Sequence, residues 1–322
     1  MENNIFERKV LDDIPILRKW LDMYSRSSKD TIARIEKEIC VFFNSIGATS
    51  IEDVENFKAD DIAKLYRESK VYRWSNNTTN SYIGTAKLFY KWANTNGVIK
   101  PNNAIFTIKR LKNDAEPKYC PPREDMQKII DAIIKHTKKK RLRVMVKTCL
   151  MAGLRRQEVC NLKIKDLMEG QIRVYGKGSK VRFQMVSQEL LDAIWDYIRT
   201  ERAVDMANYK KLGGNDLDYI FVSNVADSGK MASTKDLTNG NKICPTSFYN
   251  QVKRICEKAN IEKAEKISPH TLRHFFGTSI YEQTLDLALT QEAMRHSDMS
   301  TTRRYVHINE EKMKDALKNI AI

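Results

Sequence analysis

The sequence predicts a mainly α-helical protein of two domains, with a small β-hairpin or sheet in the second domain. Three observations support this fold class. Apolar residues recur at helical spacing along most of the 322-residue chain. Clear alternation of apolar and polar residues occurs only at 171–175 and 181–185. A charged stretch with prolines, near residue 115, separates two segments that are each long enough to bury a core.

Helices fill the first of these segments. We expect them at about 12–24, in a segment that starts after Ser28, at about 59–67, and at about 79–95. Polar residues before the fourth helix offer several N-caps. The charged stretch ends in prolines, which cannot continue a helix, so it is a natural boundary. The predicted division is a first domain of residues 1–112, a linker of 113–119 and a second domain of 120–322.

The second domain is expected to begin with helices at about 123–134 and 142–151. The strands at 171–175 and 181–185 are joined by Gly176-Lys177-Gly178-Ser179-Lys180, a Gly-rich link whose length suits a hairpin. A further short strand is expected at 219–222 and a polar surface loop at 225–242. Helices are expected to resume near Thr246 and to continue to the C-terminus.

Composition restricts the class of partner and the compartment. A net charge of +15 and a pI near 9.4 suit a polyanion, because Lys and Arg that neutralise phosphates release condensed counterions. No apolar run approaches the ~18–20 residues of a membrane span, and the first residues do not read as a signal peptide. We therefore expect a cytoplasmic protein. Its six cysteines form no C-x-x-C pair and are expected to be reduced thiols, several of them in the core.

The segment 268–278 has the strongest chemical signal. It begins with Ser-Pro, a good N-cap followed by a good first helical residue. His270, Arg273 and His274 then face broadly one way in the first turns, where free N–H groups and the helix dipole favour an anion. The pattern suggests a phosphate pocket. There are two alternatives. One is a metal bound by the two histidines, although the metalloprotease pattern has Glu directly after its first histidine and residue 271 is Thr. The other is a merely solvated polar face.

A second segment, 294–307, places Arg303 and Arg304 directly before Tyr305, with His296 nearby. A lone tyrosine usually fills a core or a surface. Basic neighbours make a nucleophilic role arguable for this one.

Taken together, these segments resemble the ordered signature of the tyrosine recombinase, or phage integrase, family, with an Xer-like layout. The motifs are Gly153-Leu154-Arg155-x-x-Glu158, the lysine-bearing hairpin, His270-x-x-Arg273, His296-Ser297-Asp298 and Thr301-Thr302-x-x-Tyr305. They occur in the family's order over about residues 120–308. The resemblance implies that the first domain is a helical core-binding domain, which binds DNA, and that the second is the catalytic domain.

The activity implied by this resemblance is site-specific cleavage and rejoining of DNA strands through a 3′-phosphotyrosyl intermediate, without metal, ATP or another cofactor. The residues that match the family's catalytic positions are Arg155, Lys177, His270, Arg273, His296 and the nucleophile Tyr305.

Each role fits the chemistry of its residue. The fork-shaped guanidinium groups of Arg155 and Arg273 match the negative charge on the non-bridging oxygens of the transition state. Lys177 would protonate the departing 5′-oxygen. His270 would help to accept the tyrosine proton, and His296 would donate a hydrogen bond to the phosphate.

Four neighbouring residues leave alternatives open. Arg156 could replace Arg155, whose assignment depends on the Gly-Leu-Arg register, and Lys180 is the alternative to Lys177. Glu158 either orients an arginine or packs structurally, and we favour the structural role. Arg295 stands where the family commonly has the small residue of Leu-Gly-His, and it could alter the local turn or add a phosphate contact.

The implied partner is double-stranded DNA, bound by a homo-tetramer with two protomers per site, in the nucleoid and not at a membrane. The family includes chromosome-dimer resolvases and integrases of mobile elements, and the sequence does not separate them. The C-terminal tail could pack on its own domain or on a neighbouring protomer. One rival is a type IB topoisomerase, against which the length and the compact hairpin argue. Another is a DNA-binding protein without activity, against which the complete catalytic set argues.

Overall fold

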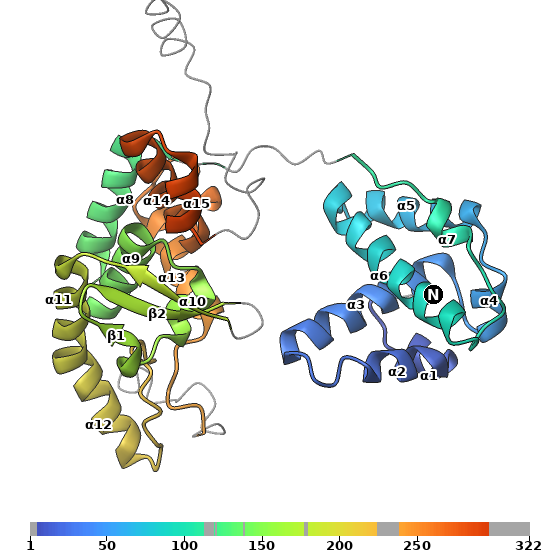
Figure 1. Ribbon diagram of the computed structural model, residues 1–322, viewed down its shortest axis with the longest axis horizontal. Helices are drawn as coiled ribbons and strands as arrows, with labels where there is room; N and C mark the ends of the chain where they lie inside the picture. The colour runs from blue at the N-terminus through green and yellow to red at the C-terminus, as the bar shows by residue number, and fades with distance from the viewer. Residues whose placement is uncertain are drawn as a thin grey trace, which may run out of the picture. The chain divides into compact units, whose positions relative to one another are not determined.

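The computed structural model describes residues 5–112, 119, 121–137, 139–176, 180–223 and 238–295. They are mostly helical and include a three-stranded sheet, which confirms the predicted fold class. The chain divides into two compact units, Met1–Pro117 and Lys118–Ile322 (Figure 1). Each unit has its own hydrophobic core. Among the described residues, no helix is both long and apolar enough to cross a membrane.

The first unit is a helical bundle built around two long helices. Its elements are α1 (Val10–Asp13), α2 (Pro15–Asp22), α3 (Lys29–Ile46), α4 (Ile51–Glu55), η1 (Ala59–Asp61), α5 (Ile62–Val71), α6 (Asn76–Thr95) and α7 (Ala104–Thr107). Helix α3 begins at the predicted Ser28, whose hydroxyl accepts the amide hydrogen of Thr31 at 3.2 Å. Aromatic rings join the two long helices, since Phe43 and Phe89 meet edge to face at 5.4 Å.

The helix expected at about 12–24 is two helices, so this prediction was wrong in part. Ile14 separates them with φ −125° and ψ 77°, outside the helical region. Pro15 explains the break, because its ring disfavours the α conformation of the residue before it and it has no amide hydrogen to donate. The pattern of apolar residues continues across the break, and periodicity alone therefore did not reveal it.

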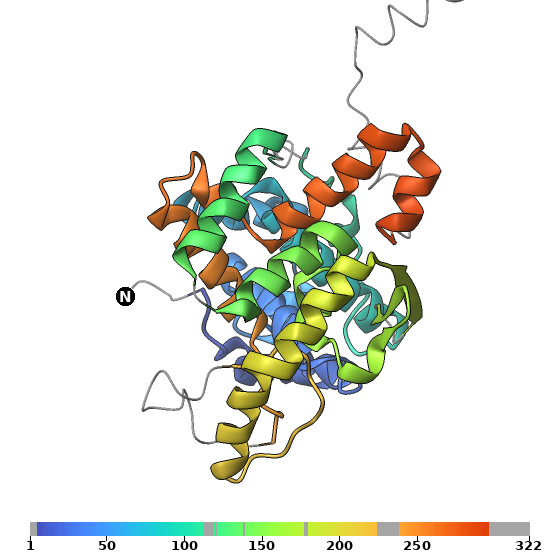
Figure 2. The ribbon, with the colours of Figure 1, turned by 90° about the vertical axis from the view of Figure 1, so that its left-hand side faces the viewer.

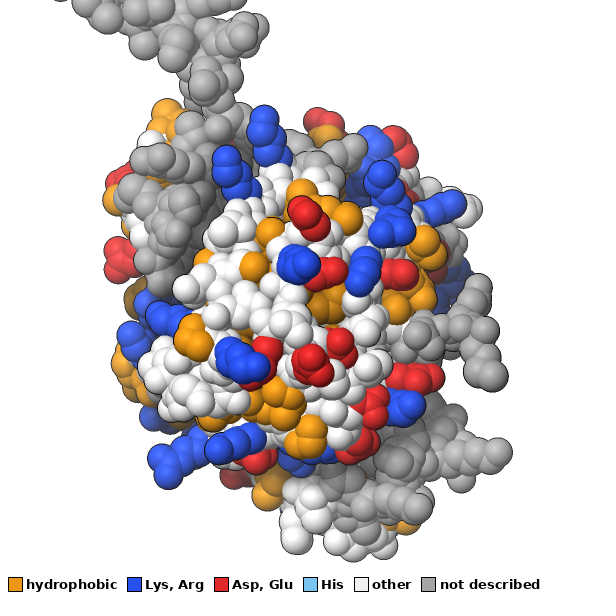
Figure 3. Space-filling view, turned by 90° about the vertical axis from the view of Figure 1, so that its right-hand side faces the viewer, with side chains coloured by type: hydrophobic (Ala, Val, Ile, Leu, Met, Phe, Trp, Pro, Cys, Tyr) orange, Lys and Arg blue, Asp and Glu red, His pale blue; other side chains and the backbone are white. Residues whose placement is uncertain are grey.

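The face of the molecule in Figure 3 carries lysines and arginines interspersed with acidic and hydrophobic side chains. No single-sign surface covers this face. The excess of 15 positive charges over the whole chain is therefore not gathered there.

The second unit packs helices around α9, with a small sheet. Its elements are α8 (Arg123–His136), α9 (Lys140–Ala152), α10 (Arg156–Asn161), η2 (Ile164–Asp166), β1 (Leu167–Met168), β2 (Gln171–Tyr175), β3 (Val181–Met185), α11 (Gln188–Tyr197), η4 (Ile198–Arg202), α12 (Ala203–Lys211), α13 (Pro245–Lys258), η5 (Ala264–Lys266), α14 (Pro269–Thr284) and α15 (Leu287–Ala293). Helix α9 packs against α14 and α11. The π-helical η4 joins α11 to α12, so the three follow one another as a single rod (Figure 2).

The sheet has the order β1-β2-β3 and is antiparallel throughout. Its hairpin confirms the two predicted strands, and the amide of Gly176 closes it by donating to the carbonyl of Lys180 at 2.8 Å. The strand expected at 219–222 was wrong. Only isolated bridges form there, Lys163 with Tyr219 and Val222 with Lys242, because each neighbouring segment pairs with it through only two backbone hydrogen bonds.

Strand β3 reverses the usual arrangement of a half-buried strand. Phe183 and Met185 are 53% and 73% exposed, whereas the polar Gln184 between them is buried. Gln184 pairs with Ile172 of β2, whose side chain is completely buried. The inward face of the hairpin therefore offers an amide to the interior of the unit.

The turn after α9 requires a glycine. Gly153 caps the helix with φ +58°, in the left-handed region that glycine enters without a steric penalty. A Cβ atom at this position would lie 2.3 Å from Cδ1 of Phe276 in α14. The next residue, Leu154, is completely buried, and Arg155 follows it with a side chain that is 45% exposed. The turn thus anchors the chain in the core and directs Arg155 outward.

Replacing Gly153 by alanine should lower the free energy of unfolding by about 2–5 kcal/mol. The left-handed backbone costs a residue with a Cβ about 1–2 kcal/mol, and the contact with Phe276 adds the cost of overpacking, about 1–3 kcal/mol. Urea denaturation followed by circular dichroism measures the loss. The control is Gly170→Ala, because Gly170 has φ +69° but no atom within 4 Å of the added Cβ. Equal losses in the two variants would show that contact with Phe276 contributes nothing.

Candidate active site

A cavity of about 430 Å³ lies where α10, α13 and α14 meet. Its lining residues are Arg155, Arg156, Gln157, Tyr249, Ser268, Pro269 and His270. Two of the predicted catalytic residues, Arg155 and His270, therefore border the same space, although 115 positions separate them in the sequence. Two arginines and a helix N-terminus around one cavity favour an anionic ligand.

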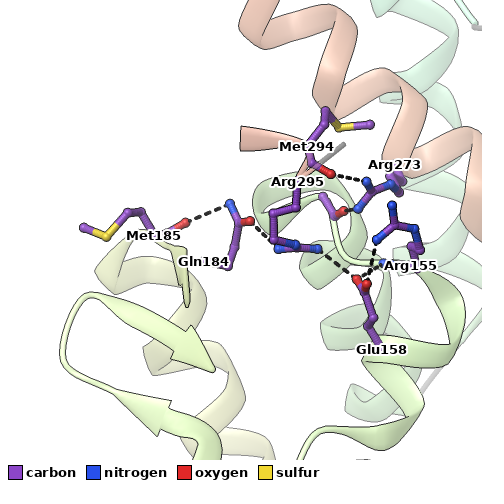
Figure 4. Close-up of polar contacts among 8 residues, drawn as sticks. Arg155, Glu158, Gln184, Met185, Arg273, Met294 and Arg295 are labelled. Atoms are coloured by element: carbon purple, nitrogen blue, oxygen red, sulfur yellow. Dashed lines mark hydrogen bonds and ion pairs between the residues drawn. The ribbon is translucent and has the colours of Figure 1, made fainter. Parts of the chain in front are cut away.

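Arg155 is held in place by the helix that follows it. It is the N-cap of α10, and its backbone amide donates to Oε2 of Glu158 at 2.8 Å. Its Nη1 donates to Oε1 of the same carboxylate at 2.8 Å (Figure 4). Arg156, the alternative to Arg155, lies over the ring of Tyr249 at 5.7 Å from the centroid. Both arginines reach the cavity, and of the two it is Arg155 that Glu158 orients.

Arg273 lies behind the cavity and is almost entirely buried, with 1% of its surface exposed. Its Nη1 donates to the carbonyl of Gly153 and its Nη2 to the carbonyl of Met294 (Figure 4). His274, beside it on α14, is also buried. The alternative of a merely solvated polar face is therefore wrong, because only His270 of the three predicted residues is exposed.

The two histidines of α14 contact one another. The ring of His270 meets the ring of His274 edge to face, with 4.4 Å between centroids. Ser268 caps the helix as predicted, accepting the amide hydrogen of Thr271 at 3.3 Å. Among the described residues, no group of three or more His, Cys, Asp or Glu side chains gathers, so the described structure gives this histidine pair no third metal ligand.

Glu158 is 9% exposed and holds two arginines at once. Besides Arg155, it contacts Arg295, whose Nη2 lies 2.8 Å from Oε2 of the carboxylate. The two roles considered for Glu158 are therefore both present, since it orients one arginine and is part of the buried packing. Burial opposes its ionisation, but the guanidinium groups of Arg295 and Arg155 and the amide of Arg155 together hold the pKa of Glu158 below its ordinary value.

Arg295 is directed inward, to side chains of its own unit. Its Nη1 donates to Oε1 of Gln184 in β3, and its side chain is 5% exposed. Its φ of +51° lies in the left-handed region, which residues with a Cβ atom rarely adopt. Burial lowers the pKa of Arg295, and the charge of Glu158 opposes that shift.

The remaining predicted residues, Lys177, His296 and Tyr305, lie outside the described residues. Lys180, the alternative to Lys177, is described and exposed, directly before β3. The structure thus brings together Arg155 and His270 at the cavity, with Arg273 behind them.

Sequence reasoning missed Gln184, Tyr249 and the inward direction of Arg295. One signal could have found Gln184. In a strand whose alternate side chains face the core, it falls on the same face as Ile172 and Val174 of the paired strand, and a polar group there needs a partner. No comparable signal marks Tyr249, which contacts Arg156 from a different helix.

The cysteines agree with the expectation of free thiols. Cys40, Cys149, Cys160 and Cys256 are buried and Cys244 is exposed, all without a disulfide. Cys120 lies outside the described residues.

Comparisons with known proteins show the family of the chain. Residues 122–312 match the Phage integrase family. Tyrosine recombinase XerC of Thermodesulfovibrio yellowstonii is 30% identical over 290 residues, which are 88% of this chain and 87% of that protein. Tyrosine recombinase XerA of Pyrococcus furiosus is 29% identical over 266 residues, 81% of this chain and 80% of that protein. The crystal structure of XerH site-specific recombinase bound to a palindromic difH substrate, a post-cleavage complex, has a similar fold. Its TM-score is 0.66 at 22% identity, covering 94% of this chain and 83% of that one.

The lowered pKa of Glu158 predicts a pH dependence of stability. A carboxylate whose folded-state pKa is depressed stabilises the fold above its unfolded pKa, and this contribution is lost as the pH falls through the folded pKa. We expect Glu158→Gln to lower the free energy of unfolding by about 3 kcal/mol at pH 7, because it leaves buried Arg295 without its anion. The difference from the wild type should shrink once the pH falls below 4.5, the ordinary pKa of the group.

Urea denaturation at a series of pH values measures this difference. Comparing variant with wild type at each pH removes the contribution of the other carboxylates. A difference that stayed constant down to pH 2 would contradict an ionised Glu158 in the native state.

Proposed function

Because this chain belongs to the phage integrase family and is a tyrosine-type site-specific recombinase, we propose that it cleaves and rejoins double-stranded DNA through Tyr305. The observation that supports the assignment of the site is the cavity at which Arg155 and His270 meet. It is lined by cations and by a helix N-terminus, and it has no carboxylate among its lining residues. A phosphodiester suits such a space.

The proposed reaction is two transesterifications. The hydroxyl oxygen of Tyr305 attacks a phosphorus of the DNA backbone, a phosphotyrosyl bond forms at the 3′ end, and the bond to the 5′-oxygen breaks. The 5′-oxygen leaves with a proton. A 5′-hydroxyl of a partner strand then attacks the same phosphorus and releases the tyrosine. One phosphoester is exchanged for another at each step, and the chemistry has no need of ATP.

The proposed clamp on the phosphate is formed by Arg155 and Arg273. The side chain of Arg155 is 45% exposed at the cavity, so its guanidinium can turn a fork of N–H groups toward the non-bridging oxygens. Arg273 already donates to two carbonyl groups. A guanidinium has five N–H donors in a fork, and we propose that Arg273 presents part of this fork to the phosphate when DNA is bound.

The proton transfers are assigned to His270 and Lys177. His270 is exposed on the first turn of α14, beside Arg155, and we assign to it the acceptance of the tyrosine proton. Lys177 lies in the link that Gly176 and Lys180 close, and we assign to it protonation of the 5′-oxygen. His296 follows Arg295, and we assign to it a hydrogen bond to the phosphate.

The first domain, residues 1–112, is proposed as the core-binding domain, joined by a linker of 113–119 to a catalytic domain of 120–322. Its helical bundle has a separate core, so it can form part of a clamp around DNA. Two protomers bound to each site, and four in the synaptic complex, would bring the two exchanging strands together. The chain would then work in the nucleoid, where its substrate lies.

Replacing Tyr305 by phenylalanine should abolish covalent protein–DNA adducts and leave DNA binding unchanged. The variant lacks the attacking oxygen but keeps the ring. The measurement uses fragmented chromosomal DNA from the cells that encode this chain, with adducts trapped by detergent and sequenced to locate the cleavage site. A nicked duplex of that site then allows single-turnover kinetics. Tyr281→Phe, a tyrosine of α14 to which we assign no role, is the matched control. Adducts that persisted in Tyr305→Phe would identify a different nucleophile.

Cleavage should proceed at the wild-type rate in excess EDTA. Transesterification by a tyrosine uses guanidinium and ammonium groups where many nucleases use divalent cations. The same nicked duplex is incubated with the enzyme after dialysis against EDTA, and adducts are counted over time. Loss of cleavage that Zn²⁺ or Mg²⁺ restored would support a metal bound by His270 and His274.

A further inference from the structure

Arg295 is a buried arginine in a backbone conformation that an arginine rarely adopts. Its φ is +51° and its side chain is 5% exposed. A left-handed backbone and the burial of a cation both cost free energy, so the contacts of the side chain must offset both. Those contacts are the carboxylate of Glu158 at 2.8 Å and the amide oxygen of Gln184. The residue is therefore fixed by what its guanidinium binds.

The first consequence concerns charge. Glu158 receives Nη1 of Arg155 on one oxygen and Nη2 of Arg295 on the other, each at 2.8 Å. One carboxylate and two guanidinium groups leave a net charge of +1. If Arg295 were absent, Glu158 would neutralise Arg155 within the pair. Arg295 thus satisfies the buried carboxylate and leaves the charge of Arg155 available to an anion in the cavity.

The second consequence concerns position. Arg295 connects three parts of the unit: α10 through Glu158, β3 through Gln184, and the turn after α15, in which it lies (Figure 4). The carbonyl of the preceding residue, Met294, accepts from Arg273. One side chain therefore couples Arg155, Arg273 and the strand that follows the lysine-bearing link.

We propose that Arg295 is a positioning residue for DNA cleavage: by holding Glu158 and Gln184 it sets the place of Arg155 and leaves its charge free for the scissile phosphate. This inference rests on the proposed function. It differs from a direct phosphate contact, because the guanidinium of Arg295 is bound by Glu158 and Gln184 (Figure 4) and Arg295 does not line the cavity of Arg155 and His270. The strand β3 is held in the same network, and the link that carries Lys177 leads directly into it.

The test compares four variants: Arg295→Gly, Arg295→Lys, Glu158→Gln and the double variant Arg295→Gly/Glu158→Gln. Glycine suits the left-handed backbone, so Arg295→Gly removes the guanidinium without adding backbone strain. Lysine keeps the charge but has one terminal nitrogen in place of a fork, so it binds Glu158 or Gln184 less well. The double variant removes the buried cation and the carboxylate together and restores the charge balance around Arg155.

Single-turnover cleavage of the nicked duplex and binding of the same duplex are measured for each. We expect Arg295→Gly to cleave roughly 10- to 100-fold more slowly, because Arg155 would be displaced from its contact with the transition state. The affinity for DNA should be unchanged. Arg295→Lys should recover part of the rate, and the double variant should cleave faster than Arg295→Gly. Glu292→Gln, which removes an exposed carboxylate three residues before Arg295, is the matched control and should cleave as the wild type does.

Cleavage by Arg295→Gly at the wild-type rate would overturn the proposal, and so would a double variant no faster than Arg295→Gly. Thermal unfolding of the same variants provides a second readout that requires no substrate. The losses of Arg295→Gly and Glu158→Gln should be far from additive in the double variant, since Glu158→Gln leaves buried Arg295 without its anion and Arg295→Gly removes one of the two cations that bind Glu158. If the wild type formed no adduct, the proposed function would fail. Non-additive unfolding would then still support the coupling of Arg295 to Glu158, and additive unfolding would overturn it.

Discussion

The buried guanidinium group of Arg273 is the contact on which the geometry of the catalytic unit depends. A cation removed from water needs acceptors, and Arg273 finds them in the carbonyls of Gly153 and Met294, which come from two different turns. Helix α14 is thereby tied to the end of α9 and to the end of α15. The residues that follow these carbonyls lead directly to Arg155 on one side and to Arg295 on the other. Both ends of the site are therefore placed by one side chain.

The charges of the site follow a single arrangement. Three arginines surround one buried carboxylate, Glu158, and two of them bind it directly. Burying so many cations in the absence of acceptors would be unfavourable, but each has a carboxylate, amide or carbonyl oxygen as partner. The excess positive charge remains on the side of Arg155, where the cavity opens. A site for a phosphodiester needs this excess, and the unit obtains it without exposing Arg273 or Arg295 to solvent.

Much of the fold could be predicted from the sequence because its determinants are local. Ser28 and Ser268 were recognisable as N-caps, and the two strands of the hairpin as alternating segments around a Gly-rich link. Where prediction failed, the structure was determined by something other than the spacing of apolar residues. A single proline divided the first expected helix although its apolar spacing continued. The segment 219–222 pairs with each neighbouring segment through only two backbone hydrogen bonds, and a pattern of side chains cannot reveal how far such pairing extends. The two-residue β1 is too short to show a period at all.

The candidate site could be predicted as a set of residues, but not as a geometry. The helical repeat placed His270, Arg273 and His274 on one polar side of α14, and this is correct as an angle around the helix axis. The helical repeat could not show that this polar side of α14 is exposed at His270 and buried at Arg273, within one turn of the helix. That change in burial is set by carbonyls 120 positions before Arg273 and 21 positions after it. Arg295 shows the same limit from the other direction. Its sequence neighbours suggest a surface turn, and only the distant Glu158 and Gln184 make it an interior residue. The types of residue in the sequence therefore indicate the chemistry of this site. Its electrostatics depend on contacts between segments far apart along the chain, which the sequence does not show.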